Sequence, residues 1–152
     1  MAKAQRARVV DLTPVQAFEL WTDVSRWPTF VDGFGHVERI GDDWPQAGAK
    51  IVWRSVPTGR GMVTEKVRES IPGVRFQTDV LEERLIGTQT VEFAIPEEEG
   101  GTAVVMSLDY TLLKKGPFAW LTDVVFIRRA QNDALARTLR RFATEAAEQA
   151  AL

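Results

Sequence analysis

The chain has 152 residues with a formal net charge of −2, and 45% of its residues are hydrophobic and 26% charged. This length and balance fit a single domain over residues 1–152 with a substantial core. Proteins that bind nucleic acids through a strongly basic surface are excluded, because the net charge is close to zero. Cysteine is absent, which excludes disulfides, thiolate nucleophiles and Cys-ligated metals and is typical of a reducing compartment, so we expect a cytoplasmic protein.

The first predicted elements are a strand and a capped helix. The segment QRARVVDL, residues 5–12, has the composition of a short strand. Thr13, Pro14 and Gln16 then occupy the N-cap, N1 and N3 positions of a capping box, so a helix is expected to begin there. A second, shorter helix is expected over residues 26–31.

From residue 37 the hydrophobic pattern changes to a period of two. Six stretches alternate or are continuously apolar, which predicts six further strands of an antiparallel sheet. They cover residues 36–40, 50–56, 61–71, 74–82, 86–95 and 102–113. Gly116 and Pro117 then mark the start of a last helix that is expected to extend to about Ala150.

Alternation along the strands separates an inward from an outward face of the sheet. In the stretch GMVTEKVRESI we expect Val63, Glu65, Val67 and Glu69 to point inward, which leaves Arg68 on the outside. On the later strands the expected inward side chains are mainly apolar: Phe76, Thr78, Val80, Val91, Phe93, Val104, Met106, Leu108 and Tyr110.

This order of elements predicts an α+β fold in which a curved sheet of six to seven antiparallel strands wraps around a long C-terminal helix, with two short helices after the first strand. The opening DLTPVQAFELWTDVSRWPTFV, the strand GGTAVVMSLDYTL and the terminal helix resemble the START-like superfamily, also called SRPBCC, in its polyketide cyclase and lipid-transport branch. The resemblance implies the helix-grip fold. It defines the function poorly, because this scaffold carries many activities.

Large aromatic side chains gather in the segment DVSRWPTFVDGFG, where Pro28 and two glycines interrupt regular structure. In proteins of the resembling fold this segment lies beside the mouth of a cavity between sheet and long helix. Trp27, Phe30 and Phe34 would therefore line or cover that mouth. The alternative is that they simply fill the end of the core.

Glu65 is expected deep on the concave face, where an unpaired carboxylate is costly. Arg128 and Asn132 lie on the buried stripe of the last helix, so Arg128 is the expected partner, and the pair would hold a polar group of a ligand. The alternative is a rim ion pair with Arg128 directed outward. The expected ligand-binding residues are Trp27, Phe30, Phe34, Trp53, Glu65, Val67, Phe76, Thr78, Val80, Gln89, Val91, Phe93, Met106, Leu108, Tyr110, Val124 and Arg128.

Signals for catalysis are few. His36 is the one histidine, no serine stands in a Gly-x-Ser-x-Gly motif and no glycine-rich phosphate loop is present, so we expect neither a metal nor a cofactor. Aromatase/cyclases of the superfamily use a cavity arginine and polar groups on the strand that corresponds to residues 63–71, whereas Arg68 is expected to point outward. Proton transfer by Glu65 is the enzymatic alternative.

Three functions stay open. The apolar inward positions favour the binding or transport of a hydrophobic small molecule such as a lipid, isoprenoid or polyketide. The second function is a cyclase-like enzyme that uses Glu65, and the third is a protein-interaction module whose cavity is filled by core side chains. The apolar segment 117–127 needs cover from its own chain, a second subunit or a transient membrane contact, so we expect a monomer or homodimer without stable membrane insertion and without a nucleic-acid partner.

Overall fold

The computed structural model describes residues 2–57, 59–96, 98, 100–113 and 126–152. Within these residues the strands are β1 Ala2–Val10, β2 Phe34–Ile40, β3 Lys50–Ser55, β4 Met62–Ile71, β5 Arg75–Leu81, β6 Leu85–Ala94 and β7 Thr102–Leu112. The helical elements are α1 Pro14–Thr22, the 3-10 helix η1 Val24–Arg26, α2 Trp27–Phe30 and α4 Arg128–Ala150.

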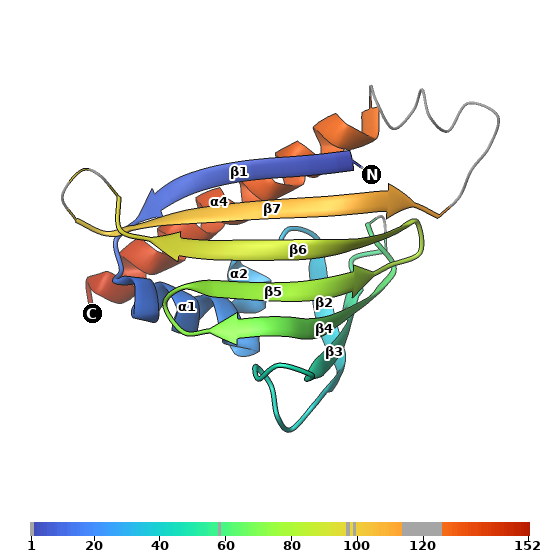
Figure 1. Cartoon of the computed structure of the whole chain (residues 1–152), viewed down its shortest axis with the longest axis horizontal. Coiled ribbons are helices and arrows are strands. Elements are labelled where there is room, and N and C mark those ends of the chain that lie inside the picture. Colours follow the sequence, from blue (N-terminus) through green and yellow to red (C-terminus); the bar gives the residue numbers. More distant parts are fainter. Residues whose placement is uncertain (1, 58, 97, 99, 114–125) are drawn as a thin grey trace.

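The strands form one antiparallel sheet in the order β1-β7-β6-β5-β4-β3-β2 (Figure 1). From β2 to β7 each strand pairs with the next along the chain, and β1 pairs with the outer side of β7. This arrangement confirms the predicted helix-grip fold: an antiparallel sheet of seven strands, two short helical segments after β1 and a long C-terminal helix on the sheet.

The capping box predicts the start of α1 correctly. The Thr13 hydroxyl accepts a hydrogen bond from the Gln16 N–H at 3.2 Å, and the Gln16 side chain accepts one from the Thr13 N–H at 3.0 Å. The helix expected over residues 26–31 is instead η1 followed by the single turn of α2. The Asp23 carboxylate accepts from the Ser25 N–H at 3.1 Å and so caps a separate element.

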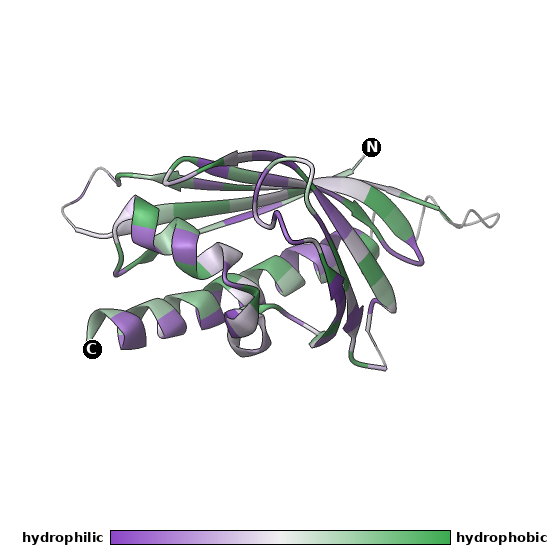
Figure 2. Ribbon diagram, turned by 90° about the horizontal axis from the view of Figure 1, so that it is seen from below, coloured by the Kyte–Doolittle hydropathy of each residue, from purple (hydrophilic) through white to green (hydrophobic). Residues whose placement is uncertain are grey.

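The helices form a second layer on one face of the sheet (Figure 2). α4 contacts β1, β7, α1 and α2, and Leu135, Leu139 and Phe142 on its inner stripe are buried as predicted. The predicted helix start at Gly116 and Pro117 and the expected ligand contact Val124 lie outside the described residues.

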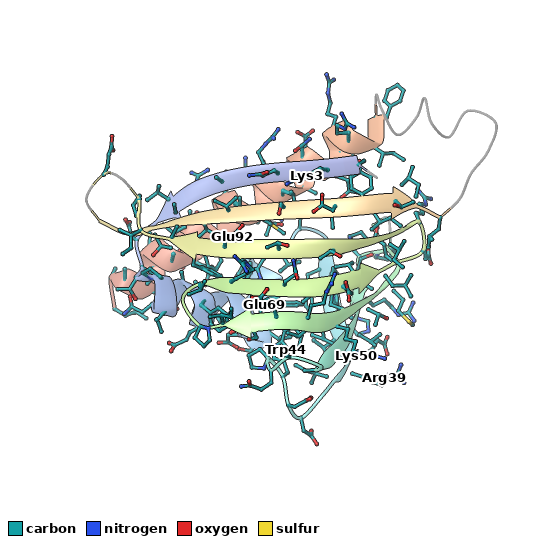
Figure 3. The ribbon with its side chains drawn as sticks, in the orientation of Figure 1. Lys3, Arg39, Trp44, Lys50, Glu69 and Glu92 are labelled. Atoms are coloured by element: carbon teal, nitrogen blue, oxygen red, sulfur yellow. The ribbon has the colours of Figure 1, made fainter. Side chains whose placement is uncertain are left out.

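Alternation on β4 holds as far as its bulge. Val63, Glu65 and Val67 are buried on the concave face as predicted, but the expected inward position of Glu69 is wrong. The register shifts between Val67 and Glu69, which turns Glu69 to the outer face. There its carboxylate accepts from Arg75 at 3.2 Å, and Arg75 also pairs with Glu92. Glu69 and Glu92 both lie on this face of the sheet (Figure 3). Sequence periodicity cannot show a bulge, because one extra residue reverses the alternation without changing composition.

Candidate functional site

A cavity of about 120 Å³ lies between the concave face of the sheet and the first half of α4. The sheet contributes Trp53 from β3, Glu65 from β4, Gln89 from β6, and Met106 and Leu108 from β7. The helical layer and loops contribute the rest of the wall: Trp21, Trp27, Val31, Asp32, Arg60, Ala130, Gln131, Ala134, Leu135 and Thr138. The cavity therefore has an aromatic and aliphatic wall with a small number of polar groups, as ligand sites do.

The polar floor of the cavity is Glu65 and its two hydrogen-bond donors. The Trp53 indole N–H donates to Glu65 Oε2 at 2.8 Å, and the Thr78 hydroxyl donates to Glu65 Oε1 at 2.9 Å. Glu65 is 5% exposed, Thr78 1% and Trp53 fully buried. Two protein donors thus hold the carboxylate in one orientation at the cavity wall.

The expected ion pair between Glu65 and Arg128 is not formed. Arg128 is exposed at the first residue of α4, and Glu65 has Trp53 and Thr78 as its polar partners in the described part of the chain. One turn further along α4, Asn132 accepts from the Gln5 N–H at 3.1 Å, so this side of the helix faces β1 and not the cavity. Arg128 is directed outward, as the alternative expects, but the rim ion pair of that alternative is not formed among the described residues.

Arg60, from the loop between β3 and β4, forms one rim of the cavity. Its guanidinium lies over the Trp53 ring, 5.1 Å from the ring centroid, and its Nε donates to Glu82 Oε2. The stacking and the hydrogen bond fix the arginine at the entrance to the aromatic wall. Arg60 is the cationic side chain among the described lining residues.

Another part of the cavity wall is held to α4 through Asp32. Its carboxylate accepts two hydrogen bonds from Arg137, at 2.9 and 3.1 Å, and one from Arg141 at 3.3 Å, while its backbone N–H donates to the Thr138 hydroxyl at 3.0 Å. Burial raises the pKa of Asp32, but the hydrogen bond and charge of Arg137, with Arg141, outweigh it and hold this pKa below its ordinary value.

The aromatic side chains after α1 have different surroundings. Trp27 lines the cavity, and its ring makes edge contacts with Trp44 at 5.8 Å and Trp53 at 6.3 Å between centroids. Phe30 packs against Phe142 at 5.0 Å, away from the cavity lining. Phe34 contacts Trp27 and Trp53 without lining the cavity. Both interpretations of this segment therefore apply, each to different residues.

The structure brings part of the predicted set together at the cavity: Trp27, Trp53, Glu65, Gln89, Met106 and Leu108. The other described side chains of the predicted set, apart from Arg128, are buried in the core or pack against it and do not line the cavity: Phe30, Phe34, Val67, Phe76, Thr78, Val80, Val91, Phe93 and Tyr110. Thr78 still belongs to the site, because it holds Glu65.

Sequence reasoning missed Trp21, Val31, Asp32, Arg60 and the residues of α4 that complete the wall. The α4 residues could have been found, because Gln131 and Thr138 lie on the same face as Leu135 at helical spacing. Asp32 and Arg60 come from loops, where no periodicity indicates which way a side chain points.

The described residues contain neither a cluster of metal ligands nor a membrane-spanning helix. No three His, Asp or Glu side chains gather there closely enough to hold a metal ion. No helix in this part of the chain is both long and apolar enough to span a bilayer.

The fold and the cavity define a helix-grip protein of the SRPBCC superfamily. The chain belongs to the polyketide cyclase/dehydrase and lipid transport family, whose sequence profile matches residues 1–147. No curated protein matches the chain.

Solved structures share the fold at low sequence identity. The di-domain ARO/CYC StfQ from the steffimycin biosynthetic pathway is 15% identical with a TM-score of 0.76, over 99% of this chain and 52% of StfQ. The protein TTHA0849 from Thermus thermophilus is 16% identical with a TM-score of 0.72, over 97% and 99% of the two chains. A protein from Rhodobacter sphaeroides is 22% identical with a TM-score of 0.70, over 97% and 93%.

Proposed function

We propose that this protein binds a hydrophobic small molecule in the cavity between the sheet and α4. The observation that carries the proposal is the wall itself: three tryptophans, Met106, Leu108 and Leu135 surround a space that one buried carboxylate enters. Membership of a family named for polyketide cyclases and lipid transport supports a ligand of this kind.

The size of the cavity limits the part of the ligand that it holds. Its volume of about 120 Å³ is near the roughly 150 Å³ of an apolar cavity that binds benzene. A lipid, isoprenoid or polyketide ligand would therefore place one ring or a short stretch of chain here, unless the walls move apart. We propose a cytoplasmic carrier or sensor formed by one domain, as a monomer or homodimer.

Toluene is a suitable probe because it matches the cavity in size and can contact the aromatic and aliphatic part of its wall. Tryptophan fluorescence should report its binding, since Trp21, Trp27 and Trp53 line the cavity. Leu108→Lys should abolish the response, because the longer side chain takes the space that toluene needs and its ammonium, close to Glu65, makes the cavity polar. Ser107→Lys on the adjacent residue of β7, a position that does not line the cavity, should bind toluene like the wild type.

A folded Leu108→Lys protein with unchanged toluene affinity would place the site elsewhere. A wild-type protein that does not respond to toluene, and that carries no small molecule in native mass spectrometry after purification, would favour the interaction module. In that case the cavity would be a packing defect of the core.

A cyclase-like enzyme is the second candidate, because Glu65 faces the cavity and could exchange a proton with a bound molecule. Arg68 does not support it: this side chain lies on the outer face and pairs with Asp79 at 3.5 Å. An aromatic product formed from a poly-β-ketone substrate by the wild type, and lost in Glu65→Gln, would favour the enzyme.

A further inference from the structure

Among the acidic and basic side chains that line the cavity, some form ion pairs with other residues of the chain and one does not. Among the described residues these side chains are Asp32, Arg60 and Glu65. Asp32 is paired with Arg137 and Arg141, and Arg60 with Glu82. Glu65 makes no ion pair within the described part of the chain, and its polar partners there are the neutral donors of Trp53 and Thr78.

The geometry of Glu65 leaves acceptor capacity toward the cavity. A carboxylate has about four acceptor positions, and each Glu65 oxygen uses one, for Trp53 or for Thr78. The side chain is 5% exposed, so water replaces a missing partner poorly. A buried carboxylate without a cation is stabilised by every further donor that reaches it.

A second polar group lies near the same point. Gln89 lines the cavity and is directly opposite Thr78 in the pairing of β5 with β6. Its amide offers both a donor and an acceptor. A ligand group that donates to Glu65 can therefore also find an acceptor or a donor on Gln89.

We propose that Glu65 makes the cavity selective for hydrophobic molecules that present a hydrogen-bond donor, a hydroxyl or an ammonium group, and that it excludes carboxylates. This inference rests on the proposed binding function and names the ligand class. The hydrophobic part contacts the tryptophan and aliphatic wall, while the donor reaches Glu65. A ligand carboxylate at the same point would be repelled by the Glu65 carboxylate, and a hydrogen bond from the Gln89 amide would not offset that repulsion.

Four ring compounds of similar size test the inference: toluene, benzyl alcohol, benzylamine and benzoate. The readout is the indole N–H signal of Trp53 in ¹H–¹⁵N NMR spectra, assigned with Trp53→Phe, because this N–H is hydrogen-bonded to Glu65. At neutral pH benzyl alcohol and benzylamine should bind at least tenfold more tightly than benzoate. They should also shift the Trp53 signal more than toluene does.

Benzylamine separates selectivity by Glu65 from simple exclusion of ions. A cavity that is apolar throughout disfavours ammonium and carboxylate groups alike. A cavity in which Glu65 contacts the ligand accepts the ammonium group and repels the carboxylate. Glu65→Gln should reduce the difference between benzylamine and benzoate to less than about threefold. Glu69→Gln, which removes the same charge from the outer face of the same strand, should leave the wild-type difference unchanged.

Several outcomes would overturn the inference and leave the binding function intact. Toluene binding with equal affinities for benzyl alcohol and benzoate is one, and an unchanged preference in Glu65→Gln is another. If Glu65→Gln does not fold, the wild-type series decides, and a Trp53 signal that moves no more with benzyl alcohol than with toluene overturns the inference. If none of the four compounds binds and native mass spectrometry finds no retained small molecule, the proposed function itself fails.

Discussion

At the scale of single residues, the unit of Trp53, Glu65 and Thr78 joins three neighbouring strands, β3, β4 and β5. An indole N–H and a hydroxyl supply the donors where the sequence pattern predicts a guanidinium. These neutral donors stabilise the carboxylate, and they leave open the space that a long arginine side chain would occupy. The floor of the cavity is therefore both polar and accessible to a ligand.

Thr78→Val tests this unit. The substitution keeps the shape of the side chain but removes the donor to Glu65 Oε1, so a buried acceptor loses its partner. We expect the free energy of unfolding in urea to fall by about 1–3 kcal/mol. Thr88→Val is the control, because its hydroxyl donates to Asp79 on the exposed face, and it should change stability by less than about 0.5 kcal/mol. Equal effects of the two variants would show that the hydrogen bond at Glu65 contributes little.

Alternation is sufficient to place Glu65, Met106 and Leu108 on the concave face, but it does not separate the side chains that line the cavity from those that fill the core. It cannot identify the partner of Glu65, because that depends on the register between β3 and β4 and on how far α4 extends across the sheet. Periodicity also treats Trp53 as an apolar side chain alone, although its indole N–H is a donor. A buried carboxylate and a tryptophan on adjacent predicted strands are the signal that could have suggested the pair.

At the scale of elements, Asp32 joins the segment after α2 to α4 and so fixes the rim of the cavity. Its folded pKa lies below the ordinary value, so the ion pairs stabilise the fold above the unfolded pKa of about 3.9. This contribution is lost as the pH falls through the lower folded pKa. The partners Arg137 and Arg141 are 43% and 44% exposed, which limits the contribution at neutral pH to less than about 1 kcal/mol.

Asp32→Asn should therefore be less stable than the wild type at pH 7 and equally stable at a pH well below about 3.9, as measured by urea unfolding across that range. Asp79→Asn, at the exposed ion pair with Arg68, is the matched control and should change stability by less than about 0.5 kcal/mol at pH 7. A difference between Asp32→Asn and the wild type that grows on acidification would show that the sign assigned to Asp32 is wrong.

The order of the elements could be predicted because each has a local signal: a capping box for α1, a period of two for the strands and a buried stripe for α4. The exceptions have non-local causes. The bulge after Val67 depends on pairing with β5, and the division of the second helix into η1 and α2 depends on the cap at Asp23. Of the loop residues at the rim, Asp32 depends on partners on α4 more than a hundred positions away, and Arg60 depends on Trp53 and Glu82.

At the scale of the whole molecule, the two layers pack closely at one end and leave space at the other. Where α4 presents Phe142, the side chain contacts Trp21 and Phe30 at centroid distances of 5.2 and 5.0 Å. Where α4 presents Ala130 and Ala134, the cavity begins. Small side chains on the first half of the helix thus create the space that the tryptophans surround.

Ala134→Leu should fill that space and so separate stability from binding. An isobutyl group in place of a methyl group contacts the cavity wall, and filling an apolar cavity commonly stabilises a protein by about 0.5–2 kcal/mol. The same group occupies the volume that a ligand needs, so we expect the affinity for toluene in fluorescence titrations to fall at least tenfold while the midpoint of thermal unfolding stays equal or rises. Ala136→Leu on the exposed side of α4 should leave the affinity unchanged. These opposite changes in affinity and stability are expected of a carrier, because the space that holds its ligand is space that core side chains do not fill. If Ala134→Leu instead binds toluene like the wild type, the ligand site lies outside the cavity, and α4 serves the core alone.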